Sequence, residues 1–298
     1  MFETLGRFTA LTCLHLIGTY IFFTNEAAGL SHALRHLPRL KQLRMPKNNV
    51  RMADDFVLAA PLARLTDLEA LDFRRSVFDT IRGGGVQALT PALALLTRLT
   101  ELRLGKGHID SPTGRSLAPL LAQLTSLAAL DLAGNSLSAA GLEALAPSLR
   151  RLSRLTELCL KNNRIDAAGA AALSPALALL TTLEVLDLSG NRLSAAGWET
   201  LAPALRRLPR LREVCLGHNM IDAAGAAALA PALAQLTALE VLDLNHNRMG
   251  AAGAAALAPA LDRLSRLQNL SFRIDDLTRD EALRLVPALA RRDRLVIE

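Results

Sequence analysis

Leucines and polar residues alternate in a frame that returns every 28 residues through the middle of the chain. The segments that begin at Leu155, Leu183, Leu211 and Leu239 read LTELCLKNNRI, LEVLDLSGNRL, LREVCLGHNMI and LEVLDLNHNRM. In each, the x-L-x-L-x core alternates with a period of two, which predicts a short strand with one buried face. Self-similarity at this spacing is typical of a solenoid, in which stacked repeats share one continuous core.

The repeats cover nearly the whole chain. Ten of them are anchored on a first leucine, and these are Leu11, Leu40, Leu68, Leu99, Leu127, Leu155, Leu183, Leu211, Leu239 and Leu267. The longest spacing places an insertion near Arg82–Gly85, where three glycines predict a loop. We expect a single solenoid over 1–298, with irregular repeats at 1–98, regular repeats at 99–266 and a C-terminal repeat or cap at 267–298.

The last residues continue the pattern. Leu295–Glu298 is expected to start an eleventh strand. A solenoid needs a polar terminal cap, and two explanations stay open for this end of the chain. Either segment 279–294 serves as the cap, or the chain is a fragment of a longer protein.

An asparagine follows each regular strand, and its amide can turn inward to pair with backbone groups of the loops. Stacked over the repeats, these residues are expected to form a ladder of Asn135, Asn163, Asn191, Asn219 and Asn247, with Asn48 nearer the N-terminus.

Helical segments come next in each repeat. Ser138, Asp166, Ser194 and Asp222 precede Ala-Ala-Gly runs and are expected to be helix N-caps. Leucines then recur at helical spacing, and a proline recurs inside each helix, from which we expect a kink or a restart at every proline. The order of elements predicts an α/β horseshoe with a parallel sheet on the concave face and helices on the convex face.

This motif resembles the leucine-rich repeat, and its 28-residue helical form resembles the ribonuclease-inhibitor class. That class also includes the Ran GTPase-activating proteins and the repeat domains of NOD-like receptors. The run Gly225–Ala230 (GAAALA) is similar to the GALA-type repeats of bacterial plant-pathogen effectors, but no F-box is identified in the chain. The resemblance implies the solenoid fold and a binding role, while the same fold serves many partners.

Neighbouring repeats also alternate, so that the true unit has 56 residues. The fifth and seventh repeats carry Ser-Ala-Ala-Gly and end in Leu-Arg-Arg-Leu, whereas the sixth and eighth carry Asp-Ala-Ala-Gly and end in neutral residues. Duplication of a two-repeat block is the simplest explanation. Trp198 replaces a small or aliphatic residue of this unit, and we expect it to pack between helices rather than to lie on the convex surface.

Composition narrows the classes of protein to consider. Hydrophobic residues make up 51% of the chain but aromatics only 3%, the net charge is +6, and there are three cysteines. An odd, low cysteine count argues against a secreted disulfide scaffold, and Cys159 and Cys215, two strands apart, are expected to be too distant to bridge. No stretch is long enough to span a membrane, and a signal peptide is disfavoured, so an intracellular, cytoplasmic setting is expected.

The concave surface is the expected binding site. From the fourth repeat to the ninth, carboxylates alternate between two outward strand positions, and the N-terminal strands carry arginines. The expected contact set for a protein partner is Arg103, Asp131, Glu157, Asp187, Glu213 and Asp243. Two interpretations stay open: a docking surface of complementary charge, or ordinary solvent-facing polarity copied by duplication.

A second charged surface, which we call the arginine edge, lies where helices end and strands begin. It consists of Arg150, Arg151, Arg154, Arg206, Arg207, Arg210, Arg212, Arg263 and Arg266. Cations at helix C-termini favour the macrodipole, which is one explanation, and a stripe that binds RNA or another polyanion is the other. Few aromatic residues interleave with these arginines for base stacking, which argues against the second.

Enzyme chemistry has little support in the sequence. Cys215, His218, Asp243 and His246 fall on adjacent repeats, but their spacing follows from the repeat itself. No phosphate-binding glycine loop or oxyanion hole is recognised, and no cofactor or metal is expected. The leading hypothesis is a non-catalytic module, monomeric by itself, that binds a protein. The alternatives are a scaffold subunit of a large, RNA-containing assembly and a Ran-GTPase-activator-like or bacterial effector regulator.

Overall fold

Eleven strands form one parallel sheet in the order of the chain. The computed structural model describes residues 2–18, 24–48, 58–75, 85–272 and 295–297. The strands are β1 (Cys13–His15), β2 (Gln42–Arg44), β3 (Ala70–Asp72), β4 (Glu101–Arg103), β5 (Ala129–Asp131), β6 (Glu157–Cys159), β7 (Val185–Asp187), β8 (Glu213–Cys215), β9 (Val241–Asp243), β10 (Asn269–Phe272) and β11 (Leu295–Ile297). The pairing of β11 with β10 confirms the expected eleventh strand.

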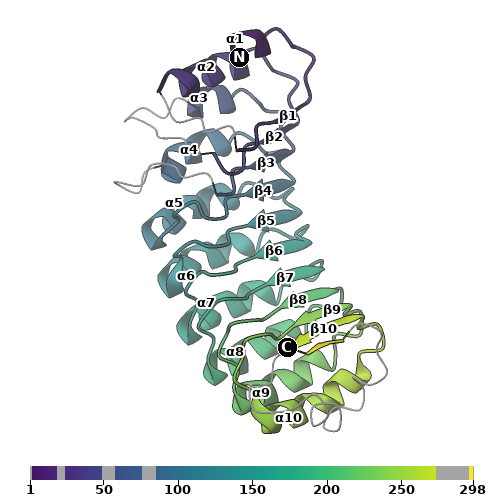
Figure 1. The fold of residues 1–298 in the computed structure, drawn as a ribbon. Helices are drawn as coiled ribbons and strands as arrows, with labels where there is room; N and C mark the ends of the chain where they lie inside the picture. Colours follow the sequence, from purple (N-terminus) through teal and green to yellow (C-terminus); the bar gives the residue numbers. More distant parts are fainter. Residues whose placement is uncertain (1, 19–23, 49–57, 76–84, 273–294, 298) are drawn as a thin grey trace.

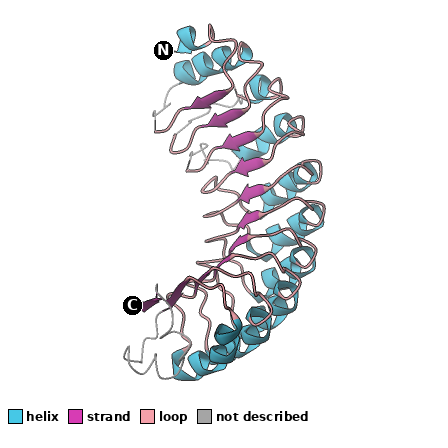
Figure 2. Cartoon of the chain, turned by 90° about the vertical axis from the view of Figure 1, so that its right-hand side faces the viewer, coloured by secondary structure: helices cyan, strands magenta, loops and turns pink. Residues whose placement is uncertain are grey.

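Helices cover the other side of the sheet. They are α1 (Phe2–Leu5), α2 (Thr24–Arg35), α3 (Ala59–Leu62), α4 (Gly85–Leu93), α5 (Ser111–Leu121), α6 (Ser138–Leu149), α7 (Ala167–Leu177), α8 (Ala195–Leu205), α9 (Ala223–Leu233) and α10 (Gly250–Arg263). Parallel strands lie about 4.8 Å apart, while packed helices need about 8–10 Å, so the stack bends toward the strands. The chain is accordingly an arc with the sheet inside and the helices outside, as expected (Figure 1, Figure 2).

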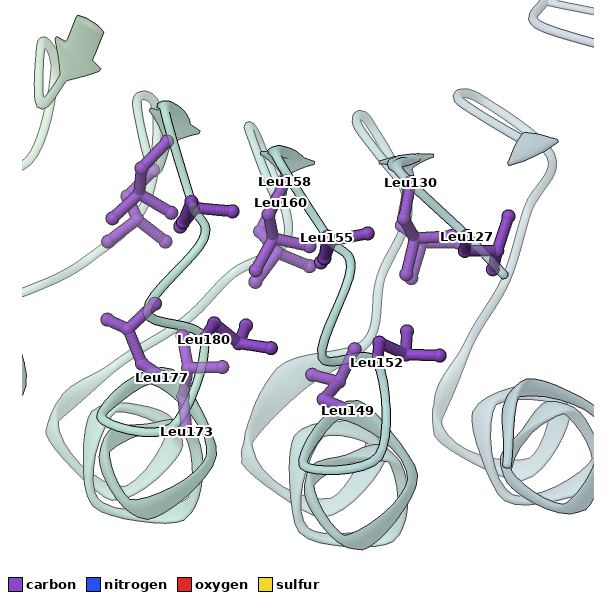
Figure 3. Close-up of a cluster of buried hydrophobic side chains, with 14 of the residues drawn as sticks. Leu127, Leu130, Leu149, Leu152, Leu155, Leu158, Leu160, Leu173, Leu177 and Leu180 are labelled. Carbon is purple, nitrogen blue, oxygen red and sulfur yellow. The ribbon is translucent and has the colours of Figure 1, made fainter. Parts of the chain in front are cut away.

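A column of leucines joins the two layers. The middle residue of each strand pairs with its equivalent in the next strand, as Leu130 does with Leu158 and Leu158 with Leu186. Behind them, helix leucines such as Leu149 and Leu177 point back toward the strands, and these side chains are fully buried (Figure 3). Burying one leucine contributes about 1.5–3 kcal/mol, so each repeat is held mainly by contact with its neighbours.

The helices run through their prolines, and the expected restart at each proline is therefore wrong. Pro147 lies inside α6 and Pro203 inside α8, and both helices continue to a leucine two residues beyond. A proline removes one hydrogen bond to the carbonyl four residues earlier. Pro147 and Glu143, the residue that carries this carbonyl in α6, are both exposed. Pro147 thus lies on the solvent-exposed side of α6, where a lost backbone hydrogen bond is least costly.

The helix caps differ between alternate repeats. Asp166 and Asp222 are N-caps as expected, and each side chain accepts a hydrogen bond from a backbone N–H, that of Gly169 at 2.9 Å and that of Gly225 at 2.8 Å. Ser194 lies at the N-cap position but makes no side-chain cap bond. Ser138 is not an N-cap, because it has a positive φ of 52° and lies inside the assigned helix.

Trp198 is packed as expected. It is 0% exposed, and a side chain on Gly225 of the next helix would come within 3.2 Å of its ring. Its indole Nε1 has no hydrogen-bond partner, which shows that shape rather than polarity places this residue.

Two expected features fall outside the described residues: most of the Arg82–Gly85 loop and the candidate cap at 279–294. Within the described part of the chain, no helix combines the length and the apolar character that a membrane crossing requires.

Candidate functional site

The six residues of the expected contact set lie on strands β4 to β9 but are not equally accessible. Glu157 is exposed, while Arg103, Asp187, Glu213 and Asp243 are half-buried. Asp131 is only 8% exposed, so the expectation that it faces solvent is wrong. The inner curve of a solenoid brings neighbouring strands close together, and side chains on one strand cover those on the next.

The aspartates at the ends of the strands hold the loops that follow them. An Oδ1 oxygen accepts the backbone N–H two residues later at Asp131 (from Ala133, 2.8 Å), Asp187 (from Ser189, 2.9 Å) and Asp243 (from Asn245, 2.9 Å). This turn is a common use of aspartate. The sequence contains a signal for this turn, because an aspartate is the last strand residue of alternate repeats. The sequence pattern alone suggested only a surface charge for these aspartates. These aspartates therefore have a structural role whether or not they bind a partner.

Ion pairs compensate the strand charges at the N-terminal end of the sheet. Arg44 pairs with Glu101 at 3.0 Å, Arg103 pairs with both Glu101 and Glu157, and Arg74 pairs with Asp72 at 2.8 Å. The hydrogen bond from Arg74 to Asp72 raises the pKa of that arginine. The expected basic end of the concave face is thus largely neutralised along its strands.

The carboxylates toward the C-terminal end lack such partners. Within the described part of the chain, no lysine or arginine forms an ion pair with Asp187, Glu213 or Asp243. The concave face therefore carries an acidic region on β7 to β9 whose carboxylates have no cationic partner among the described residues, while the carboxylates on β4 and β6 are paired with arginines.

A shallow hollow of about 230 Å³ lies between these two regions. Its lining brings together Arg103, Asp131, Glu157, Asp187 and Glu213, five of the six expected contact residues, with Arg74, Val185 and Cys159 among the others. Asp243 lies outside it. The hollow has the paired arginines Arg74 and Arg103 on its side toward β3 and β4, and the carboxylates Asp187 and Glu213 on its side toward β7 and β8.

Two thiols in this region are expected to be poor nucleophiles. Cys159 and Cys215 are free and half-buried, and burial raises the pKa of each to about 12. Nearby carboxylates act in the same direction, because they disfavour a thiolate. The nucleophilic form is therefore scarce at neutral pH.

The histidines of the eighth and ninth repeats lie against each other. The rings of His218 and His246 are stacked with centroids 4.1 Å apart, and burial lowers the pKa of His218. In the part of the chain that the structure describes, no three histidine, cysteine or acidic side chains converge as they would around a metal ion. Of the four residues considered in the sequence, His218 and His246 therefore form a stacked pair, and Cys215 and Asp243 do not join them in a cluster of ligands.

The ladder asparagines are all buried, and their amides pair with loop backbone. Nδ2 of Asn163, for example, donates to the carbonyl of Leu132 in the preceding repeat at 2.8 Å. The side-chain oxygens behave differently from repeat to repeat. Oδ1 of Asn191 accepts two backbone N–H groups, from Asn163 (2.9 Å) and Ile165 (3.0 Å), whereas Oδ1 of Asn219 has no partner.

Comparison with known proteins agrees with this architecture. A family model described as "Leucine Rich repeat" matches residues 123–146, 180–202 and 235–258. No curated protein sequence matches the chain. Among solved structures, an internalin from Listeria monocytogenes is 20% identical, with a TM-score of 0.56 over 100% of this chain and 83% of that one. This likeness concerns the fold alone. The repeat frame, the parallel sheet and the matched segments together show that the chain folds as a leucine-rich-repeat solenoid.

Proposed function

We propose that the chain is a non-catalytic module that binds a protein partner on its concave face. The observation that carries this proposal is the hollow on β4 to β8, where compensated arginines meet uncompensated carboxylates on a continuous sheet. Such a surface is held rigid by the repeats on both sides, so it orders few side chains when a partner binds. The 28-residue helical repeats also support the ribonuclease-inhibitor-like class.

The charge of the hollow suggests which part of a partner it binds. Asp187 and Glu213 lie on adjacent strands beside Val185, an arrangement that suits the aliphatic stem and cationic head of a lysine or arginine. Complementary charge at a central contact contributes to specificity and to the association rate. The partner is therefore proposed to present a basic segment.

The test must separate binding from folding. Asp187 and Asp131 also hold loops, so their substitution would disturb the fold as well as the surface. Glu157 and Glu213 accept no backbone hydrogen bond among the described contacts, and they are the better sites. The matched control is Glu143 and Glu199, exposed residues on the convex helices α6 and α8.

The immobilised full chain is used to capture and identify a protein from an extract of its own source, and the purified partner is then titrated by calorimetry. The double variant Glu157→Lys and Glu213→Lys is expected to weaken binding at least tenfold, about 1.4 kcal/mol. The variant Glu143→Lys and Glu199→Lys is expected to bind like the unchanged chain. Equal affinities for all three chains, or equal losses in both variants, would contradict the concave-face proposal.

A further inference from the structure

The arginine edge presents repeated clusters of exposed cations. Arg150 and Arg206 occupy the C-cap positions of α6 and α8, and Arg151 and Arg207 follow them. Arg154 and Arg210 complete the two clusters just before the next strands, and all six side chains are exposed. Arg263, the last residue of α10, and Arg266 occupy the places equivalent to Arg207 and Arg210, while Asp262 replaces the first arginine of the cluster. The clusters are therefore separated by two repeats each time.

Favourable interaction with the helix macrodipole explains only part of this pattern. One cation at a helix C-terminus contributes about 0.3–1 kcal/mol, and the effect falls off within the last turn. The intervening helices α7 and α9 end in Ala178 and Ala234 with no cation, and they are instead capped by aspartate at their N-termini. One arginine per helix would provide the same compensation, so the second and third members of each cluster remain unexplained.

The clusters are also uncompensated. In the described part of the chain, the ion pairs along this edge are Arg212 with Glu240, Arg98 with Asp67 and Lys41 with Glu69, each at 2.8 Å. None of the six arginines that follow α6 and α8 forms an ion pair with a described carboxylate. Adjacent like charges repel one another, which makes an external polyanion a favourable partner.

The spacing indicates what kind of polyanion fits. Equivalent positions two repeats apart lie about 10 Å apart at the sheet and about 16–20 Å apart at the helices. Because the solenoid is a regular stack, it presents the same cationic group at a fixed step, which suits a partner that repeats its own charge at a fixed step. A phosphodiester backbone carries a charge on every nucleotide, so it can place a phosphate against each cluster, whereas an acidic protein would need carboxylates at matching positions.

The side chains between the clusters indicate whether a single-stranded or a double-stranded nucleic acid fits this edge. At the places equivalent to Arg151 and Arg207, the intervening repeats have Leu179 and Gln235. Aromatic residues make up 3% of the chain, and Trp198 is fully buried. Base stacking, on which binding of single strands depends, therefore has no platform among the described residues of this edge. Arginine does match phosphate oxygens in a bidentate geometry.

We propose that the arginine edge binds the phosphate backbone of a nucleic-acid duplex, without preference for its sequence. The surface is distinct from the concave hollow, so the two can be occupied independently. Contacts of this kind release counterions, and binding weakens steeply with salt.

The experiment measures fluorescence anisotropy of a labelled 20-base-pair RNA duplex with the full chain over a series of salt concentrations. The test variant carries Arg154→Gln, Arg210→Gln and Arg266→Gln. The control carries Arg164→Gln, Arg192→Gln and Arg248→Gln, which removes the same charge from exposed residues on the opposite edge of the solenoid. All six side chains are exposed, and thermal unfolding monitored by circular dichroism checks that both variants fold.

The unchanged chain is expected to bind the duplex, and the test variant to bind at least tenfold more weakly at low salt. The slope of log K against log salt is expected to fall by about three in the test variant and to change little in the control. Absence of duplex binding at low salt, or equal loss in both variants, overturns the proposal. Tighter binding to polyglutamate than to the duplex would assign the edge to an acidic protein, and tighter binding to the single strand would also contradict it.

Discussion

Single residues in this chain carry roles that their type alone does not reveal. Asp131 and Asp187 occupy equivalent places at strand ends and hold equivalent turns, yet only Asp187 retains a half-exposed carboxylate without a cationic neighbour. Asp131 is buried, and its Oδ2 lies 3.9 Å from Arg74 Nε. Irregular early repeats bring arginines close to one aspartate and not to the other. The same side chain is therefore structural in one repeat and a candidate contact in another.

The cysteines provide a prediction at this scale. A thiol-specific disulfide reagent at pH 8 should modify exposed Cys13 rapidly in the folded chain, and Cys159 and Cys215 only after unfolding. Burial raises the pKa of both inner thiols from 9.0 to about 12, so their protonated forms favour folding. This contribution is fully present below about pH 9 and is lost as the pH rises toward 12. Three equivalents reacting rapidly without denaturant would contradict it.

Helices in alternate repeats are stabilised at opposite ends. The helices α5, α7 and α9 have an aspartate cap, whereas α6 and α8 have no side-chain cap and end at arginine. A negative charge at the N-terminus and a positive charge at the C-terminus both favour the macrodipole. The 56-residue repeat unit of the sequence therefore also appears in the structure, as an alternation in how the helices are capped.

This alternation predicts unequal effects at equivalent positions. Asp166→Ala should lower the free energy of unfolding by about 1 kcal/mol, because it leaves the N–H of Gly169 without its partner. Ser194→Ala should change it by less than about 0.5 kcal/mol, because Ser194 makes no cap bond. Urea unfolding of both variants and of the unchanged chain measures the difference. A loss at Ser194 as large as that at Asp166 would show that the caps are equivalent in solution.

The whole solenoid is joined by an asparagine ladder of uneven strength. Every ladder amide in the regular repeats donates to backbone carbonyls, but the oxygens of Asn191 and Asn247 accept two N–H groups each. Asn163 accepts one at 3.5 Å, and the oxygen of Asn219 accepts none. The loop after β7 has Gly190 in the left-handed region, and none of its backbone N–H groups pairs with the oxygen of Asn219. Repeats are therefore joined in strong pairs with weaker junctions between them.

Removal of one ladder side chain should reveal this pairing. Asn191→Ala leaves two more backbone N–H groups unpaired than Asn219→Ala does, and each buried unpaired group costs about 1–3 kcal/mol. Asn191→Ala should therefore lower the free energy of unfolding by at least about 1 kcal/mol more. Urea unfolding measures the total, and amide hydrogen exchange at Asn163 and Ile165 locates the change. Equal destabilisation, with unchanged exchange at these two amides, would contradict an uneven ladder.

The sequence by itself determined the repeat, the strands, the helices and the buried positions. Leu158 and Asn163 could be placed from their frame alone, because translational repetition puts each residue against its own equivalent and makes local pattern and tertiary contact the same information. The eleventh strand and the packing of Trp198 followed from the same register.

Only the tertiary structure decided which side chains are exposed and which charges are paired between neighbouring repeats. It showed that α6 continues through Pro147 at an exposed position, that Ser138 is not an N-cap, and that Asp131 is buried. It also separated the compensated carboxylate Glu101 from the uncompensated Glu213, which the sequence had placed in one series. Exposure and charge pairing depend on side chains from neighbouring strands and on the curvature of the sheet, and a one-dimensional pattern contains neither.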